Sequence, residues 1–244
     1  MIADGSLPPR ELGRAWHVDL WSDVALVLAQ LPNDESAATI PITLEGDVWR
    51  LTGRIDGVRG AQRFAVRAGS MGADHYLRAW VEHLAMLAAR EQGDTSLPDT
   101  TVLVWRERDK VKSLRYGPVP NATPRLAALV ESARDGMRRP LPFFARAGYA
   151  WGAATFVQPP GEQGKGKGKG KKTTTAATKD PRDEATKAYH EQPADYSSGG
   201  DAQDAYVALC FRGIDPMVEL WDDFERLAER LFDGWRQAML EGEG

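Results

Sequence analysis

The chain has 244 residues, of which 42% are hydrophobic and 27% are charged. A chain of this length and composition can bury a core of its own, as one large domain or two small ones. The formal net charge of −4 excludes a protein that is basic throughout, so any contact with nucleic acid requires a local patch of basic residues.

The single cysteine, Cys210, excludes an internal disulfide and any zinc site built from several cysteines. It lies in an apolar run over residues 206–211, so we expect a buried and inert thiol. One lone cysteine fits a reducing compartment, and we expect a cytoplasmic protein. Residues 1–14 lack the long apolar stretch of a signal peptide, and no segment approaches the roughly 20 apolar residues that a membrane helix needs.

The first third of the chain predicts a helix followed by three antiparallel strands. Apolar residues recur at helical spacing over residues 11–31. The period then changes to two over residues 40–44, and a tight turn leads into a second strand over residues 48–55. A third strand is expected over residues 63–68.

The middle of the chain predicts a helix, a hairpin and further helices. Asp74 is a candidate N-cap for a helix that ends near Arg90. The apolar, β-branched run over residues 101–105 is expected to pair with residues 111–116. Further helices are expected over residues 124–139, 143–151 and 184–190.

The C-terminal part predicts a buried segment over residues 204–211 and one long amphipathic helix over residues 216–239. Four aromatic residues of that helix are spaced for one face: Trp221, Phe224, Phe232 and Trp235. The favoured interpretation places them in the core, although a surplus of them would make a docking surface for a partner.

A composition change divides the chain into three parts. Residues 1–157 are expected to form a core domain, and residues 181–244 a helical extension that packs on the same domain. Residues 158–180 between them are mainly Gly, Lys, Thr and Ala, which predicts a disordered insertion. Its lysines could neutralise phosphates, but a tolerated surface insertion is the favoured interpretation. Residues 161–167 match only the first part of a phosphate-binding loop, so no ATP site is expected here.

The order of a leading helix, a three-stranded meander, a second helix and a further strand resembles the core of the PD-(D/E)XK restriction-endonuclease-like fold, an α/β (α+β) architecture. Gly53-Arg54-Ile55-Asp56 resembles the G-x-I-D signature of the RecB-type nucleases in that family. The resemblance assigns Asp56 to the metal-binding Asp. The acid and the Lys that follow in those nucleases correspond here to Ala65 and Arg67.

This departure predicts a degenerate site at Asp56, Ala65 and Arg67, with no catalytic residue, no bound metal and no cofactor. Mg²⁺ needs several oxygen ligands, Ala65 offers none, and Arg67 is a poor substitute for a compact Lys ammonium beside an attacking water. Asp56 then becomes a residue at the end of a hairpin, paired with Arg54 or Arg67. The alternative is an active metal-dependent nuclease in which another acid, Glu45 or Asp47, reaches toward Asp56.

Several short motifs in order resemble the C-terminal domain of RecC, over residues 5–157 and about 180–240. They include Gly53 to Val58, Leu77 to Leu84, Arg138 to Phe144, Tyr149 to Trp151 and Phe211 to Gly213. The resemblance implies a non-catalytic fragment of the gamma subunit of exodeoxyribonuclease V, the bacterial RecBCD helicase–nuclease complex of double-strand break repair by homologous recombination. It also implies RecB- and RecD-type subunits and double-stranded and forked DNA as partners, without a membrane. A pure protein-interaction scaffold is a third possibility.

Two groups of basic residues are candidates for DNA contact. The hairpin over residues 105–116 carries Trp105 and Tyr116 for stacking on an unpaired base, and five cations: Arg106, Arg108, Lys110, Lys112 and Arg115. An ordinary solvated hairpin is the competing interpretation. The second group, Arg138, Arg139 and Arg146 beside Phe143 and Phe144, is more typical of an interface or core anchor. His75, Glu82 and His83 share a helix but lack the spacing of a zinc site, so surface or core histidines are expected.

Overall fold

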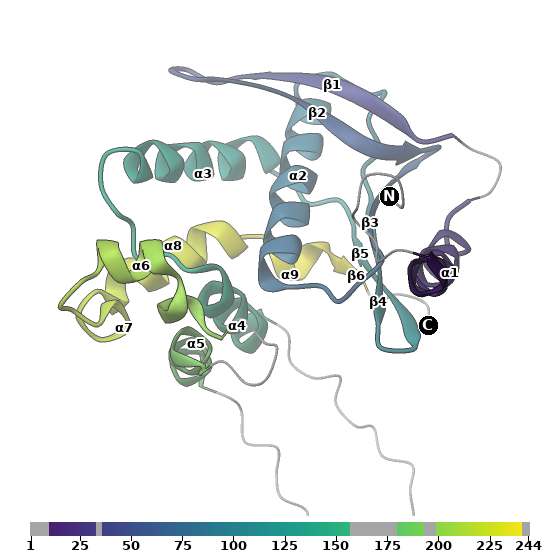
Figure 1. Ribbon diagram of the computed structural model, residues 1–244. Coiled ribbons are helices and arrows are strands. Elements are labelled where there is room, and N and C mark those ends of the chain that lie inside the picture. The colour runs from purple at the N-terminus through teal and green to yellow at the C-terminus, as the bar shows by residue number, and fades with distance from the viewer. Residues whose placement is uncertain (1–9, 33–35, 157–179, 193–198, 241–244) are drawn as a thin grey trace, which may run out of the picture. The chain divides into compact units, whose positions relative to one another are not determined.

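The computed structural model describes residues 10–32, 36–156, 180–192 and 199–240 (Figure 1). The predicted disordered insertion lies outside the described residues, except for Asp180. The chain divides into two compact units, residues 1–126 with 237–244 and residues 127–236. The expected domain limits at residues 157 and 181 stay a prediction, because most of the chain between them is not described.

The first unit is built on a six-stranded sheet in the order β1-β2-β3-β4-β5-β6. Its strands are β1 (Ala38–Glu45), β2 (Arg50–Arg59), β3 (Gln62–Arg67), β4 (Thr101–Glu107), β5 (Lys110–Tyr116) and β6 (Met239–Leu240). Neighbouring strands are antiparallel except β3 and β4, which are parallel. Helix α2 (Ala73–Glu91) connects these two, as a parallel pair requires a crossover. The mixed α+β architecture and the predicted strand order are confirmed, while the PD-(D/E)XK likeness stays a prediction.

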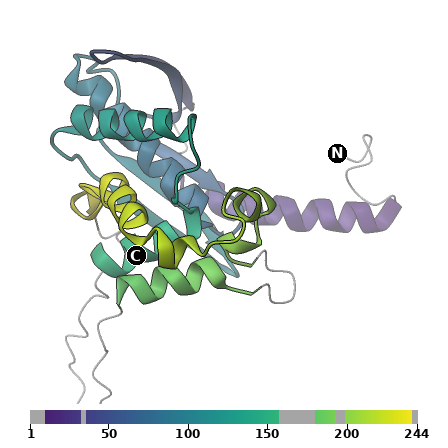
Figure 2. The ribbon, with the colours of Figure 1, turned by 90° about the vertical axis from the view of Figure 1, so that its left-hand side faces the viewer.

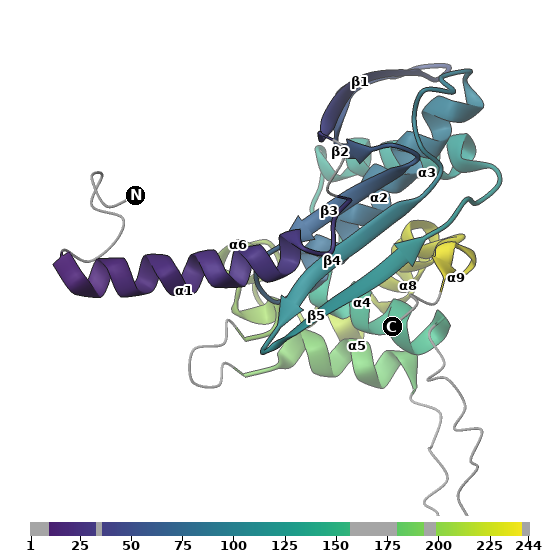
Figure 3. The same cartoon turned by 90° about the vertical axis from the view of Figure 1, so that its right-hand side faces the viewer.

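Helices α1 (Arg10–Leu28) and α2 cover opposite faces of this sheet (Figures 1 and 3). On the α1 face, Val27 and Leu31 pack with Phe64, Val102 and Val104 in a buried cluster. The rest of α1 extends away from the sheet (Figure 2) and exposes large apolar side chains: Leu12, Trp16, Val18, Leu20 and Trp21. On the α2 face, the core contains the fully buried side chains of Trp80, His83 and Tyr116, whose rings contact one another.

Two local predictions in the first unit are wrong. Asp74 does not cap α2: Gly72 is the N-cap residue without a side-chain cap, and the Asp74 carboxylate accepts from His75 instead. Asp56 does not end a hairpin, because β2 continues past it to Arg59. Gly57 makes this extension possible, since its φ of 78° lies in the left-handed region and a Cβ there would come within 2.4 Å of the Phe64 carbonyl oxygen.

The second unit is helical around aromatic side chains. It contains α4 (Ala145–Phe156), α5 (Pro181–His190), η1 (Asp201–Gln203), α6 (Ala205–Cys210), α7 (Pro216–Glu219) and α8 (Trp221–Phe232). Helices α3 (Ala122–Gly136) and α9 (Trp235–Ala238) each span a limit between the units. The Phe144 ring lies 4.7 Å from that of Tyr189 and 5.4 Å from that of Phe211, and Gly152 admits the ring of Phe232 close to α4.

Core placement of Trp221, Phe224, Phe232 and Trp235 is confirmed, because none is more than 8% exposed. They do not sit on one long helix, however, and that prediction is wrong. A break at Leu220 separates α7 from α8, and Gly234, with a φ of 80°, follows the end of α8. A residue in the left-handed conformation ends an α-helix, so the amphipathic pattern runs over three short helices.

The prediction that residues 204–211 are buried is also wrong. The Asp204 carboxylate accepts from the amides of Tyr206 and Val207 and starts the short helix α6, whose side chains face solvent. Tyr206 is 80% exposed, and Cys210 is exposed rather than buried. An apolar run of this length does not say whether a core exists to receive it. Here Phe211, at the end of the run, packs on Phe144, while residues 204–206 and 208–210 are exposed.

Candidate functional site

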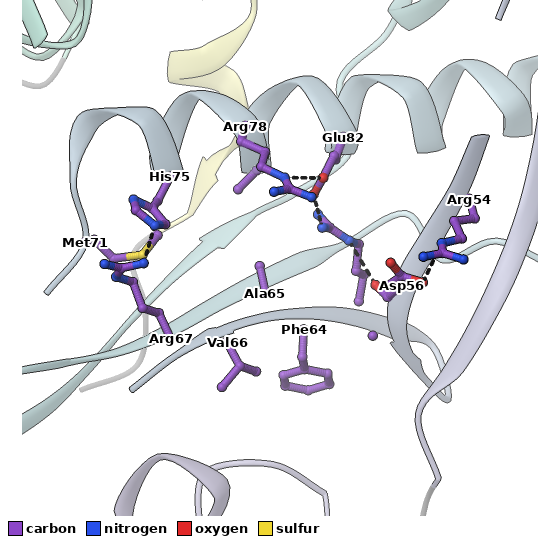
Figure 4. Close-up of a pocket in the computed structure, with 13 residues that line it drawn as sticks. Arg54, Asp56, Phe64, Ala65, Val66, Arg67, Met71, His75, Arg78 and Glu82 are labelled. Atoms are coloured by element: carbon purple, nitrogen blue, oxygen red, sulfur yellow. Dashed lines mark hydrogen bonds and ion pairs between the residues drawn. The ribbon is translucent and has the colours of Figure 1, made fainter. Parts of the chain in front are cut away.

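A cavity of about 460 Å³ lies in the first unit between β2, β3 and α2 (Figure 4). All three positions of the predicted degenerate site, Asp56, Ala65 and Arg67, line it. The remaining lining residues are Arg54, Gly57, Arg63, Phe64, Val66, Met71, His75, Arg78, Ala79 and Glu82. The fold therefore brings together the residues that the motif resemblance had assigned to one site.

The alternation of strand β3 places Ala65 in the middle of the cavity. Side chains of successive strand residues point to opposite faces of a sheet. Ala65 and Arg67 point toward α2, whereas Phe64 and Val66 point away from it (Figure 4). The methyl group of Ala65 is the smallest side chain of L-residues, so the space that a carboxylate would fill stays open.

The Asp56 carboxylate, at one end of the cavity, is paired with Thr39 and Arg54. Its Oδ1 accepts a hydrogen bond of 2.8 Å from Thr39 Oγ1 and lies 3.7 Å from Arg54 Nε. Of the two pairs proposed for it, the structure makes the one with Arg54 and not the one with Arg67. The carboxylate is largely exposed, with 61% of its side-chain surface accessible.

Arg67 lies at the other end of the cavity, held by His75 (Figure 4). Its Nε donates to the Ser70 carbonyl oxygen at 2.6 Å, and its Nη1 donates to His75 Nε2. A guanidinium can only donate, so Nε2 accepts and His75 Nδ1–H donates to Asp74, 2.8 Å away. Arg67 is thus oriented by the His75 ring and is not paired directly with a carboxylate among the described residues.

Arg63 is the buried charge of the site, with only 5% of its surface exposed. Its Nη2 pairs with Glu82 Oε2, and its Nε donates to the Asp56 carbonyl oxygen at 3.3 Å. Burial lowers the pKa of Arg63, and the adjoining Glu82 carboxylate opposes that effect. Nη1 is buried without a hydrogen-bond partner among the described residues.

Glu82 is a member of this site that the motif comparison missed. Its second oxygen accepts from Arg78 Nε at 2.8 Å, and this hydrogen bond raises the pKa of Arg78. Both carboxylate oxygens are therefore occupied by guanidinium groups. The signal in the sequence was the four-residue spacing of Arg78 and Glu82, which places both on one face of α2.

The donor set does not fit the divalent metal that the nuclease resemblance implies. The cavity has two carboxylates, Asp56 and Glu82, and both are paired with arginines. Over the described ranges, no group of three or more His, Cys, Asp or Glu side chains could hold a metal ion. Glu45 and Asp47 do not line the cavity. Glu45 pairs with Arg50 at 2.6 Å, roughly 20 Å from Asp56 along β2 at about 3.3 Å per residue.

His83 is a core histidine, as one of the expected readings of this helix had it. It is fully buried, its Nε2–H donates to the Gly117 carbonyl oxygen at 2.9 Å, and its Nδ1 accepts from Thr101 Oγ1 at 3.0 Å. Burial lowers the pKa of His83 to about 4, so the ring is neutral near pH 7.

The five cations of the β4–β5 hairpin do not form one surface. Partners in register share a face, so Arg106 and Arg115 lie on the α1 face, with Val111 and Val102, and Lys112 lies on the α2 face, opposite Trp105. Arg106 pairs with Asp23 of α1, and Lys112 pairs with Glu107. Arg108 and Lys110 are exposed at the turn, where Arg108 has a φ of 55°.

The aromatic residues of this hairpin are unavailable for stacking on a base. Trp105 is 8% exposed and Tyr116 is fully buried. Trp105 contacts Tyr76 of α2 edge to face, with ring centroids 5.8 Å apart. The predicted stacking role is wrong, because strand alternation points both rings into the core under α2.

In the second basic group, Arg138 and Arg139 are exposed and Arg146 is half-buried. Arg138 lies 4.0 Å from Asp135 on the surface, whereas Phe144 is buried, as the core-anchor interpretation expects. Asp201 accepts from the amides of Arg146 and Ala147 and so caps the start of α4. Within the described part of the chain, no helix is long and apolar enough to cross a membrane.

Comparison with known proteins gives one family. None of the curated proteins matches the chain. The family model described as the RecC C-terminal domain matches residues 1–156, which include all of the cavity and the β4–β5 hairpin. This match spans more than half of the sequence, and the chain therefore belongs to the family of RecC C-terminal domains.

Proposed function

We propose that the chain is a non-catalytic structural and DNA-handling domain of a RecBCD-type helicase–nuclease, exodeoxyribonuclease V, in double-strand break repair by homologous recombination. Family membership connects it with RecBCD-type DNA repair. The observation that carries the non-catalytic part is the composition of the cavity. Where a nuclease of the resembling family has a second acid and a Lys, this cavity has Ala65 and Arg67.

The chemistry supports this proposal. Hydrolysis of a phosphodiester with a metal needs oxygen ligands that are available to the ion and a group that orients water. Glu82 is bound at both oxygens by arginines, and Asp56 is paired with Arg54 and Thr39. The guanidinium group of Arg67 only donates hydrogen bonds, so it cannot accept a proton from water.

RecB- and RecD-type subunits and forked DNA are the partners in this proposal, with the exposed cations Arg108 and Lys110 at the hairpin turn as one DNA contact. Protein contact has its own support in α1. Trp16 and Trp21 of this helix are 52% and 62% exposed, and large exposed apolar side chains are typical of a surface that another protein covers. This observation also favours a second candidate function, a scaffold that binds only protein.

A nuclease assay tests the non-catalytic part. The purified chain is incubated with linear duplex and single-stranded DNA and either Mg²⁺ or Mn²⁺, beside its Asp56→Ala variant. We expect no cleavage above background from either protein. Cleavage by the wild-type chain that disappears in Asp56→Ala would show an active nuclease. Binding to forked DNA at low and moderate salt then separates DNA handling from a pure protein scaffold, which would not bind the fork.

A further inference from the structure

The cavity concentrates positive charge in an acidic chain. Four guanidinium groups line it, from Arg54, Arg63, Arg67 and Arg78, against the two carboxylates of Asp56 and Glu82. The cavity thus has a surplus of two positive charges, whereas the whole chain has a net charge of −4. A surplus of this kind attracts an anion.

A second, independent observation points to a ligand. Only 5% of the Arg63 surface is exposed, and its Nη1 has no acceptor among the described residues. An unpaired donor on a buried charged group costs more than an ordinary missing hydrogen bond. Because Arg63 lines the cavity, a small movement of its guanidinium group would bring Nη1 to an oxygen of a bound anion, the acceptor that the described residues do not provide.

We propose that this cavity binds a phosphodiester group of the DNA backbone, in the space left open at Ala65. The proposal rests on the DNA-handling function proposed above and names a contact for it. The former catalytic position then holds DNA without cutting it: the guanidinium groups bind phosphate oxygens, and no group is present to activate water.

The geometry favours a phosphate over a base. Planar guanidinium groups donate paired hydrogen bonds that match phosphate oxygens. Phe64, which lines the cavity, is 8% exposed and points away from α2 (Figure 4), so its ring offers no stacking surface. Contacts of this type hold the DNA backbone in register and do not read sequence.

The donors are held in place before DNA arrives. Glu82 fixes Arg63 and Arg78, which come from β3 and α2, and His75 fixes Arg67. Binding therefore costs little side-chain entropy compared with binding by mobile surface lysines. The Arg54, Arg67 and Arg78 side chains are exposed, so the cavity is accessible from solvent.

The first test removes single charges. Binding of the full chain to a fluorescent forked DNA is measured by anisotropy over a series of salt concentrations. Arg67→Gln should weaken binding about tenfold at moderate salt and lower the slope of log affinity against log salt by about 1. Arg54→Gln should act in the same direction. Arg50→Gln is the matched control: Arg50 is also exposed on β2 and paired with a carboxylate, but it does not line the cavity.

The second test changes charge at constant shape. Ala65→Glu places a carboxylate among the four arginines and should weaken fork binding about tenfold or more, whereas the isosteric Ala65→Gln should weaken it far less. Equal losses in both variants would show that filling the space matters and the charge does not, which overturns a phosphate site. Circular dichroism establishes that both variants are folded.

A third measurement separates DNA from free anions. If inorganic phosphate raises the melting temperature of the wild type but not of Arg67→Gln, while fork binding is the same in both, the site takes a free anion and the DNA assignment is wrong. Fork binding by the wild type that no cavity variant changes overturns this inference but leaves the DNA-handling function standing. A wild-type chain that does not bind the fork even at low salt overturns both.

Discussion

Two groups of basic side chains in the first unit invite comparison, the cavity beside Ala65 and the β4–β5 hairpin. In the hairpin the five cations follow one another along the sequence, but strand alternation divides them between two faces and two of them pair with Asp23 and Glu107. In the cavity the four arginines come from three elements and converge on one space. The difference teaches that density of charge along a sequence is a poor guide to a binding surface, whereas convergence of elements creates one.

Aromatic residues sharpen the same comparison. In the hairpin, Trp105 and Tyr116 are buried in the core beneath α2. In β3, Phe64 packs on the opposite face, and the small Ala65 points toward the cavity. The hairpin is thus a structural element with a charged turn, and the cavity is a polar site lined by fixed donors.

The largest expected effect is loss of stability on truncating the hairpin's buried tryptophan. Trp105→Ala should lower the free energy of unfolding by about 3–5 kcal/mol, the usual range for removing a buried large aromatic side chain. Urea unfolding followed by circular dichroism measures this. Tyr206→Ala, at an 80% exposed position, is the control and should change stability by about 0.5 kcal/mol or less. Unchanged stability would show that the Trp105 ring does not contribute to the core beneath α2.

The pH dependence of the free energy of unfolding tests the contacts of His83, which connects α2 to Thr101 of β4 and to Gly117. Burial lowers the pKa of His83 to about 4, with Arg63 acting in the same direction and the Gly117 carbonyl and Asp99 against it. The unfolded chain therefore binds the proton more readily, near the ordinary His pKa of about 6.5. This contribution to stability is complete above about pH 6.5 and is lost as the pH falls toward 4, by about 3 kcal/mol in total.

Unfolding free energies of the wild type and His83→Gln between pH 7.5 and 4.5 provide the check. Other groups titrate in this range in both proteins, so the difference between the two pH profiles isolates His83. The wild type should lose more stability than the variant as the pH falls. Parallel profiles would show that His83 does not remain neutral in the folded chain.

The smallest expected effect belongs to the hairpin turn. The double variant Arg108→Gln with Lys110→Gln removes two exposed cations for which no ion pair is seen among the described residues, and it should weaken fork binding by only about two- to threefold. Anisotropy under the conditions used for Arg67→Gln allows a direct comparison. A loss equal to or larger than that of Arg67→Gln would make the hairpin the principal DNA surface.

Much of the first unit could be predicted from local patterns. Period-two alternation marked β1, β2 and β3, helical spacing marked α1 and α2, and the motif around Asp56 found three members of the cavity. The second unit was less predictable. Helical spacing continued through Gly234 and so hid a break that depends on its backbone conformation, and the run around Cys210 looked like core although other rings fill that core.

Residue type and local spacing were enough to predict the element order, the family resemblance and a degenerate site at Asp56, Ala65 and Arg67, since these features are local. Which charges meet depends on how the elements pack. Arg63 and Glu82 are far apart in the sequence, and they pair because the crossover that makes β3 and β4 parallel lays α2 over Ala65. The four arginines and two acids that line the cavity come together because of the way β2, β3 and α2 are arranged, and the composition of these elements does not determine that arrangement.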